Sequence, residues 1–482
     1  MSSTPPPAPR WSDWQSADRW LQAWMAWEVR QARRRAGARA WRPGQPLRLL
    51  FAGYNGSRNT GADVRVEEML RQVRHLVGDA QLRPSVLTID PAASASYFLT
   101  AAQHTLPKIF PRFLARTVAG HDGVIACEGS MFKSKFASAL STMMVGSLGL
   151  ALAENKPAVA YGGEAGAMEP GLAQLVAKVC PGALLMTRNQ ASSHILTGLG
   201  LPSEAGTDTA WTFTPRRPER ANEVLTHAGW DGKQPIVTLC PINAFWWPVQ
   251  PSLRKSAIQS LTGAYGPLHY GSIYFHSWDV QRRQKQRAYL RALARVAEVL
   301  QARHGAFINL VAMEALDGQA CRTLQAMLPQ PAPILSAATL DCDTLVAALR
   351  LSRLVISSRY HAIVTSMPGQ VPSIGVTMDE RITNLMTDRG QPELALGVDD
   401  RNLEDKLRTH AERLLHDPDP TRTAITQAVR HHLQRMGEMG RHFIDHLCTR
   451  LPGFEPAVGP DDSRDMLAYL PPMAPALQQL LC

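Results

Sequence analysis

"LRLLFAGYNGSRNTGADVRVEEMLRQVRHL", residues 47–76, contains the pattern that decides the fold. An apolar run is followed by a glycine-rich turn and then by apolar residues at helical spacing. The stretch therefore predicts a strand, a tight turn and a helix. The turn from Gly53 to Gly61 leads into a helix N-terminus, whose backbone N–H groups can bind an anion. A simple tight turn explains the same glycines, because the segment is neither a Walker loop nor G-x-G-x-x-G.

Comparable apolar runs recur along the chain, and helical stretches lie between many of them. They occupy residues 85–90, 123–129, 156–163, 182–188, 235–241, 305–313, 353–359 and 371–376. Continuous apolar strands that alternate with helices indicate parallel sheets covered on both faces. These strands are too many for one sheet of usual size. We therefore predict an α/β protein with two doubly wound Rossmann-like domains that face a cleft, where the carboxyl ends of the strands gather.

The domain boundaries follow from breaks in this pattern. Residues 1–44 form a helical arm rich in tryptophan and arginine, and residues 45–220 form the first Rossmann-like domain. The polar segment "TPRRPERANE" interrupts the alternation, so the second Rossmann-like domain takes residues 221–400. Residues 401–482 are predicted to form a helical, arginine-rich tail.

Composition limits the classes of function. The chain has 482 residues and a net charge of +10, but residues 1–43 alone carry eight arginines against three acidic residues. The remaining body is mildly basic, which suits a small anionic substrate better than nucleic acid, and no nucleic-acid-binding motif is present. The seven cysteines are scattered without a C-x-x-C pair, which indicates reduced thiols rather than a metal site.

Two stretches of the sequence bear on where the protein is located. The first residues, "MSSTPPPAPRWSDW", lack the basic and apolar regions of a signal peptide, so a cytoplasmic protein is predicted. The run from Phe136 to Ala153 reaches the lower length limit of a membrane span. Its serines and glycines favour a buried core helix.

The arm from residue 16 to residue 40 leaves two interpretations open. Trp20, Trp24 and Trp27 share one helical face, and four arginines follow: Arg30, Arg33, Arg34 and Arg35. The arm is either a helix docked on the protein body or a helix at the inner face of a membrane. In the second case the tryptophans lie at headgroup level and the arginines meet anionic lipid.

Charged and polar side chains stand where several predicted strands end. Arg188 ends one strand and Ser192 begins the next helix, while Lys133 and Lys135 follow another strand. Taken singly, each is more typical of a solvated surface. Their convergence on one rim of the sheet instead indicates an anion-binding site.

The run "RLVISSRYHAIVTSMPGQVPSIGV", residues 353–376, leads a strand into Arg359 and His361 on the second domain's side of the cleft. A histidine here either completes a buried hydrogen-bond network or takes part in function. The position at a strand's carboxyl end favours function.

Four blocks of this sequence resemble the polysaccharide pyruvyl transferase family. They are "GYNGSRNTGAD" (53–63), "NKPAVAYGGEAGAMEP" (155–170), "MTRNQASSHILTGLGLPSEAGTDTAWTF" (186–213) and "SSRYHAIVTSMPGQVPSIGVTMDERITNLM" (357–386). The last two are the most specific, although Arg381 replaces the family's usual lysine. The chain also departs from the family at Glu128, which interrupts a glycine run, and in the aromatic stretch 243–280.

The resemblance implies a glycosyltransferase-B-like fold and transfer from phosphoenolpyruvate to a sugar diol of a polysaccharide or its precursor, lipid-linked acceptors included. The products are a pyruvate ketal and phosphate, and neither a cofactor nor a metal is implied. The family's donor-binding residues correspond to Arg188, Ser192, Arg359, Asn59 and Gly61, and its catalytic residues to His361 and Arg359. Arg58, Lys133 and Lys135 are candidates for further anion contacts.

Charge chemistry fits this assignment. Phosphoenolpyruvate carries a carboxylate and a phosphate, which arginine binds bidentately, and histidine can hold or release a proton near neutral pH. Two alternatives remain. The same fold would serve a nucleotide-sugar-dependent glycosyltransferase, and the altered glycine run would also fit a non-catalytic binding or scaffold protein.

Overall fold

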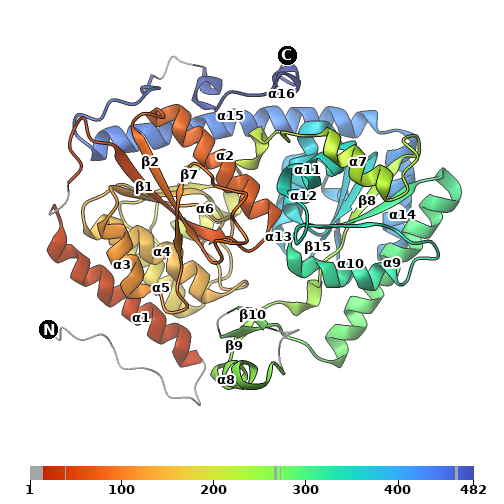
Figure 1. Cartoon of the computed structure of the whole chain (residues 1–482), viewed down its shortest axis with the longest axis horizontal. Coiled ribbons are helices and arrows are strands. Elements are labelled where there is room, and N and C mark those ends of the chain that lie inside the picture. The colour runs from red at the N-terminus through yellow and green to blue at the C-terminus, as the bar shows by residue number, and fades with distance from the viewer. Residues whose placement is uncertain (1–14, 38–39, 265–268, 272, 462–464, 482) are drawn as a thin grey trace.

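The computed structural model describes residues 15–37, 40–264, 269–271, 273–461 and 465–481. Two α/β domains lie side by side, and a long helix, α15 (Asp419–Arg450), runs along both (Figure 1). Each domain is built on a parallel sheet with helices on its two faces.

The first domain holds a seven-stranded parallel sheet in the order β3-β2-β1-β4-β5-β6-β7. Its strands are β1 (Leu47–Asn55), β2 (Leu82–Thr88), β3 (Ala102–Thr105), β4 (Gly123–Ala126), β5 (Ala158–Gly163), β6 (Leu184–Thr187) and β7 (Glu204–Ala205). Its helices are α2 (Thr60–Val77), α3 (Pro111–Ala119), α4 (Ser138–Ala153), α5 (Pro170–Val179) and α6 (Gln190–Thr197).

The second domain repeats this strand order in a six-stranded parallel sheet, β13-β12-β8-β14-β15-β16. The strands are β8 (Ile236–Cys240), β12 (Phe307–Ala312), β13 (Ile334–Ser336), β14 (Leu354–Ser357), β15 (Ser373–Thr377) and β16 (Ala395–Gly397). The helices are α7 (Glu219–His227), α9 (Val280–His304), α10 (Gly318–Gln325), α11 (Cys342–Leu351), α12 (Tyr360–Ser366) and α13 (Glu380–Asp388). The predicted pair of doubly wound Rossmann-like domains is confirmed.

All nine apolar runs proposed from the sequence form strands. The strands that sequence reasoning missed in the two large sheets lie at or near the sheet edges: β3, β7, β13 and β16. They are two to four residues long. Strands of this length are too short to show a hydrophobic alternation in the sequence. Strand β3 is also half exposed, so it lacks an apolar run.

The apolar stretch Phe136–Ala153 gives α4, a buried core helix as predicted. One side of α4 packs on the sheet, and α1 (Gln15–Ala32) covers the other. Close approach requires the glycines of α4, because a Cβ at Gly146 would lie 2.4 Å from Met25 and one at Gly149 would lie 3.2 Å from Val29. Among the described residues, no helix is long and apolar enough to cross a membrane.

The aromatic stretch 243–280 contains a small antiparallel sheet and α8 (Leu253–Thr262). Its strands are β9 (Gln250–Pro251), β10 (His269–Gly271) and β11 (Tyr274–Phe275). This unit reaches the first domain: Tyr274 Oη bonds the Asp18 carboxylate of α1 and accepts from Ala139 N, and Trp247 packs edge-on against Phe136.

The C-terminal residues are helical, in α14 (Leu403–His416), α15 and α16 (Pro475–Gln479). Helix α15 contacts α2, β5 and β6 of the first domain as well as residues 367–369 of the second. His432 of α15 stacks on Trp211 with ring centroids 4.2 Å apart. The end of the chain therefore completes the core of the first domain.

Candidate active site

The carboxyl ends of the strands in both sheets meet between the two domains. In each sheet the strand order reverses once, between β1 and β4 and between β8 and β14, and such reversals are where doubly wound sheets bind ligands. The domains touch there, since Thr60 N donates to Met313 O at 2.8 Å and Lys135 Nζ donates to Met378 O at 2.9 Å. The predicted site residues therefore lie at the interface of the domains.

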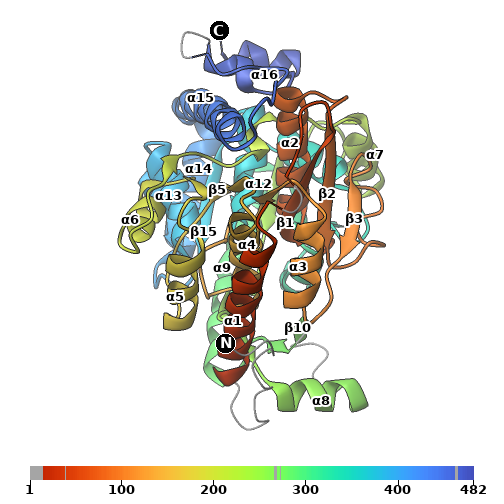
Figure 2. The ribbon, with the colours of Figure 1, turned by 90° about the vertical axis from the view of Figure 1, so that its left-hand side faces the viewer.

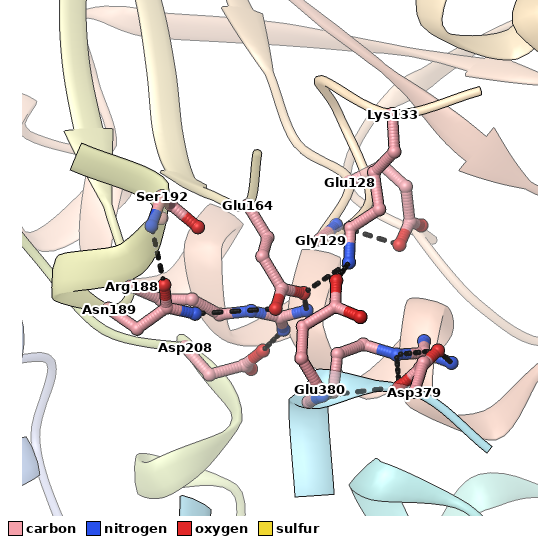
Figure 3. Close-up of polar contacts among 12 residues, drawn as sticks. Glu128, Gly129, Lys133, Glu164, Arg188, Asn189, Ser192, Asp208, Asp379 and Glu380 are labelled. Carbon is pink, nitrogen blue, oxygen red and sulfur yellow. Dashed lines mark hydrogen bonds and ion pairs between the residues drawn. The ribbon is translucent and has the colours of Figure 1, made fainter. Parts of the chain in front are cut away.

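Arg188 stands at the centre of a buried cluster of charged groups (Figure 3). Its Nη2 donates to Glu164 Oε2 at 2.6 Å, and its Nη1 donates to Asp208 Oδ2 at 2.9 Å. Lys133 Nζ lies 3.2 Å from Glu164 Oε2 and 2.7 Å from Glu380 Oε1 of the second domain. Burial acts to raise the pKa of Glu164, but Arg188 and Lys133 outweigh it and hold that pKa below its usual value.

His361 reaches this cluster from the second domain. It lies in the first turn of α12, and its Nε2 is 3.2 Å from Asp208 Oδ2. An ionised carboxylate only accepts hydrogen bonds, so Nε2 of His361 carries a proton in this contact. Burial opposes the charge of Asp208, but His361 and Arg65, followed by Arg188, hold its pKa well below the usual value.

The neighbouring Tyr360 supports this arrangement. The Arg188 guanidinium carbon lies 4.6 Å from the centroid of the Tyr360 ring, so a cation of the first domain stacks on an aromatic ring of the second. Residues 360 and 361 thus both contact the group around Arg188, and the strand end that carries them is held against the first domain.

Arg359 belongs to a second charged cluster. Its Nε donates to Asp317 Oδ2 at 2.8 Å, and its Nη2 lies 2.8 Å from Glu314 Oε2. Both carboxylates are buried and follow β12. Burial raises the pKa of Glu314 to about 7, against the lowering effect of Arg359. The structure therefore does not join Arg359 to the Arg188 cluster, although only one residue, Tyr360, separates it from His361.

The other predicted residues have local partners. Asn59 caps α2, because its side chain accepts from Gly61 N and Ala62 N. Ser192 Oγ accepts from Ala165 N at 3.0 Å and lies 3.3 Å from Ala165 O. Arg58 has a φ of 53°, and its carbonyl accepts from Ala315 N across the domain interface. The assignment of Asn59 and Ser192 to donor binding, and of Arg58 to a further anion contact, stays a prediction.

Lys135 is half-buried, and burial lowers the pKa of its ammonium group. Beside it, Arg381 pairs with Asp379 and lies over Phe136, with its guanidinium carbon 4.7 Å from the ring centroid. Lys133, Lys135 and Arg381 therefore line the same domain contact, and the arginine that replaces the family's lysine bridges the two domains.

The altered glycine run has a structural explanation. A Cβ at Gly129 would lie 2.8 Å from Arg188 Nη2, so the glycine after Glu128 leaves room for the guanidinium. Glu128 turns back and accepts from Gly129 N at 2.7 Å. The glycine that the Arg188 guanidinium requires at position 129 is present.

Sequence reasoning missed the acidic half of the site: Glu164, Asp208, Glu314 and Asp317. Glu164 follows β5 in "YGGEAG", and Glu314 follows β12 in "VAMEALD", so each stands at a strand's carboxyl end. Asp208 lies within the third family block. Arg188 and His361 were predicted because they lie at the carboxyl ends of strands. The same rule applied to acidic residues would have found Glu164 and Glu314.

Gly61 is predicted to tolerate no side chain, because a Cβ there would lie 2.2 Å from His361 Nδ1 and 2.5 Å from its Cγ. We expect Gly61→Ala to displace the imidazole from Asp208 and to lower turnover by about 10²-fold, the cost of a misplacement near 1 Å. Gly459→Ala is the control, since its Cβ would meet nothing within 4 Å. Normal turnover in Gly61→Ala would show that the position of His361 is unimportant.

No protein-family model and no curated protein matches the chain. Among solved structures, a protein from Listeria monocytogenes assigned as UDP-N-acetylglucosamine 2-epimerase matches with a TM-score of 0.51 at 10% identity, over 83% of this chain and 98% of its own. Anabaena Alr3699/HepE, solved with UDP and glucose, matches with a TM-score of 0.50 at 12% identity, over 84% of this chain and all of its own. At these identities the likeness concerns the fold alone, and it confirms the glycosyltransferase-B architecture.

Proposed function

We propose that this chain is a saccharide-modifying transferase whose reaction takes place at the Arg188 cluster, with phosphoenolpyruvate as the donor and a sugar diol as the acceptor. One observation carries the proposal: all four sequence blocks that resemble pyruvyl transferases converge there. Gly61 comes from the first block and Glu164 from the second. Arg188 and Asp208 come from the third block, and His361 comes from the fourth. Blocks that merely stabilised separate parts of the fold would not need to meet.

The cations around the cluster suit a small donor with two anionic groups. The carboxylates Glu164 and Asp208 engage two N–H groups of Arg188, and a guanidinium has five. These ion pairs fix the orientation of Arg188 before any substrate arrives. Lys133, Lys135 and Arg381 supply further positive charge at the same domain contact. Such a site also stabilises the phosphate that leaves.

Ketal formation needs a base, an acid and a leaving group. His361 takes the proton of the first sugar hydroxyl, whose oxygen forms a bond to the enol carbon while the methylene carbon receives a proton. The imidazolium that this transfer leaves on His361 is the acid that we assign to the protonation of the methylene carbon. The bond to the phosphate oxygen then breaks, and the second hydroxyl loses its proton and closes the ring.

A second candidate is a glycosyltransferase that uses a nucleotide sugar. The fold comparison favours it more directly than pyruvyl transfer, because the Anabaena structure contains UDP and glucose. On this interpretation the cations around Arg188 bind a diphosphate and His361 activates the acceptor hydroxyl. The sequence blocks favour phosphoenolpyruvate, so the two candidates differ in their donor.

The deciding experiment incubates the purified full chain with phosphoenolpyruvate or with UDP-sugars, against a panel of free, nucleotide-linked and lipid-linked saccharides. Phosphate release that requires both phosphoenolpyruvate and a saccharide, with a ketal detected by mass spectrometry, is the expected result. UDP release from a UDP-sugar with no turnover of phosphoenolpyruvate would overturn the proposal in favour of the second candidate. Phosphoenolpyruvate binding without turnover on any acceptor would point to a binding protein.

For Arg188→Lys we expect the Michaelis constant for phosphoenolpyruvate to rise by about 10- to 100-fold. A lysine keeps the positive charge but cannot donate two parallel hydrogen bonds to one anionic group, as a guanidinium does. The loss of one hydrogen bond to a charged group costs about 1.5–3 kcal/mol. Arg303→Lys is the matched control, because Arg303 pairs with Glu412 on the exposed surface. An unchanged constant, with normal donor binding by calorimetry, would place the donor's anionic groups away from Arg188.

A further inference from the structure

We propose that the outer face of α1 and α3 is a docking surface for an anionic membrane, which is independent of the reaction proposed above. Helix α1 lies outermost on the first domain, between α3 and α5 (Figure 2). We call this surface the α1–α3 face. It consists of the outward residues of the two helices and the segment 108–109 that leads into α3.

Helix α1 has two different sides, so docking on the body and membrane contact do not compete. Its inner side is buried against α4 through Met25 and Val29. Trp20, Trp24 and Trp27 lie at the edge of this buried side of α1 and are only partly buried. Removing the arm would therefore disturb the core, and a truncation cannot test membrane binding separately from folding.

Tryptophan and arginine line the groove between α1 and α3. The groove has a volume of about 450 Å³. Trp24, Trp27 and the buried Glu28 of α1 line one side of it, and Arg112 and Arg116 of α3 line the other. Just before α3 begins, the side chain of Ile109 is 58% exposed. Half-buried tryptophans, an exposed aliphatic side chain and arginines are the combination found at the headgroup level of a bilayer.

The charge of the face has one sign. The exposed ionisable side chains of the two helices and of segment 108–109 are all basic: Arg19, Arg30, Lys108, Arg112 and Arg116. The acidic residues of α1, Asp18 and Glu28, are buried, and α3 contains none. Arg33 and Arg34, directly after α1, are exposed as well. This surface complements anionic lipid.

A bilayer fits better than an acidic protein or a nucleic acid. Arginines alone could bind any polyanion, but a nucleic acid would gain nothing from the exposed isoleucine and the partly buried tryptophans of this face. A membrane takes up both components, because apolar groups enter the interface while the basic residues stay with the headgroups.

The test is co-sedimentation of the full chain with vesicles of phosphatidylcholine, with or without phosphatidylglycerol. We expect binding only when phosphatidylglycerol is present. Binding should weaken as NaCl rises from about 0.1 M to about 1 M, which shortens the Debye length from about 10 Å to about 3 Å. The double variant Arg112→Gln, Arg116→Gln should bind about 25-fold more weakly, or about fivefold for each basic residue at such a surface.

Matched controls lie elsewhere on the protein. Arg287→Gln, Arg291→Gln removes two exposed arginines at the same helical spacing on α9, and Leu261→Ser on α8 matches Ile109→Ser on the α1–α3 face. We expect both controls to bind vesicles normally and Ile109→Ser to bind more weakly. An equal loss of vesicle binding in the two double arginine variants would overturn the proposal. Tight binding to heparin by a chain that binds neither kind of vesicle would also overturn it.

Discussion

Replacing His361 with alanine is expected to lower the rate of transfer by about 10²–10⁴-fold, the usual cost of losing a general acid or base, while the chain stays folded. The imidazole lies at the domain interface with its side chain 15% exposed, and Asp208 fixes its orientation through Nε2. Because α12 stays packed through neighbouring buried residues such as Ala362 and Ile363, the fold does not depend on the ring.

Two further variants separate proton transfer from positioning. His361→Gln retains a side-chain N–H that can bond Asp208 but has no titratable nitrogen, so we expect the same loss as with alanine. His227→Ala, on the exposed side of α7, should leave the rate unchanged. If His361→Gln turns over normally and keeps the wild-type pH profile, His361 positions the substrate and does not transfer a proton.

Asp208→Asn is expected to reduce the free energy of unfolding by about 3–5 kcal/mol in urea denaturation at neutral pH, the cost of breaking a buried ion pair by removing one partner. Asp208 is fully buried, and its carboxylate faces three cationic or titratable groups: Arg65 at 3.5 Å, Arg188 at 2.9 Å and His361 at 3.2 Å. The amide would leave their charges partly uncompensated. Asp399→Asn, which breaks an exposed pair with Lys285, should cost less than about 1 kcal/mol.

The effect of Asp208→Asn should also depend on pH. The pKa of Asp208 in the folded state lies below that of the unfolded chain. Its ionised form therefore stabilises the fold fully above the unfolded value, about 3.9, and this stabilisation disappears as the pH falls toward the folded value. The difference between wild type and variant should be constant near neutral pH and shrink below about pH 4. A difference that is unchanged in acid would mean that packing, not charge, causes the loss.

The architecture was predictable because strands of a buried parallel sheet appear in the sequence as continuous apolar runs. Arg188 and His361 were found for a related reason: a charged residue directly after such a run lies at the ligand-binding edge of the sheet. The partners of these residues depend on how the two domains meet. Nothing local in residues 357–361 indicates that Arg359 pairs with Asp317 while His361 contacts Asp208, since the acids lie on different domains.

Helix α1 shows the same limit. The periodicity of Trp20, Trp24 and Trp27 correctly predicts that they share a side of a helix, but it does not say what covers that side. Gly146 and Gly149 of α4 decide which side of α1 is covered, because they leave room for Met25 and Val29. The tryptophans therefore lie at the edge of the buried side of α1. Small residues in an apolar helix indicate both burial and the close approach of a second helix.

The position of α15 has a consequence for synthesis on the ribosome. Phe443 packs against Tyr161, Gln72 donates to Met436 O, and His432 covers Trp211, so residues near the end of the chain close the core of the domain that is made first. Domains usually fold in order as they emerge during translation. Here the first domain must wait, with part of its apolar surface uncovered, until the second has been translated and α15 has left the exit tunnel. Its nascent form is therefore the stage at which a chaperone has the most surface to bind.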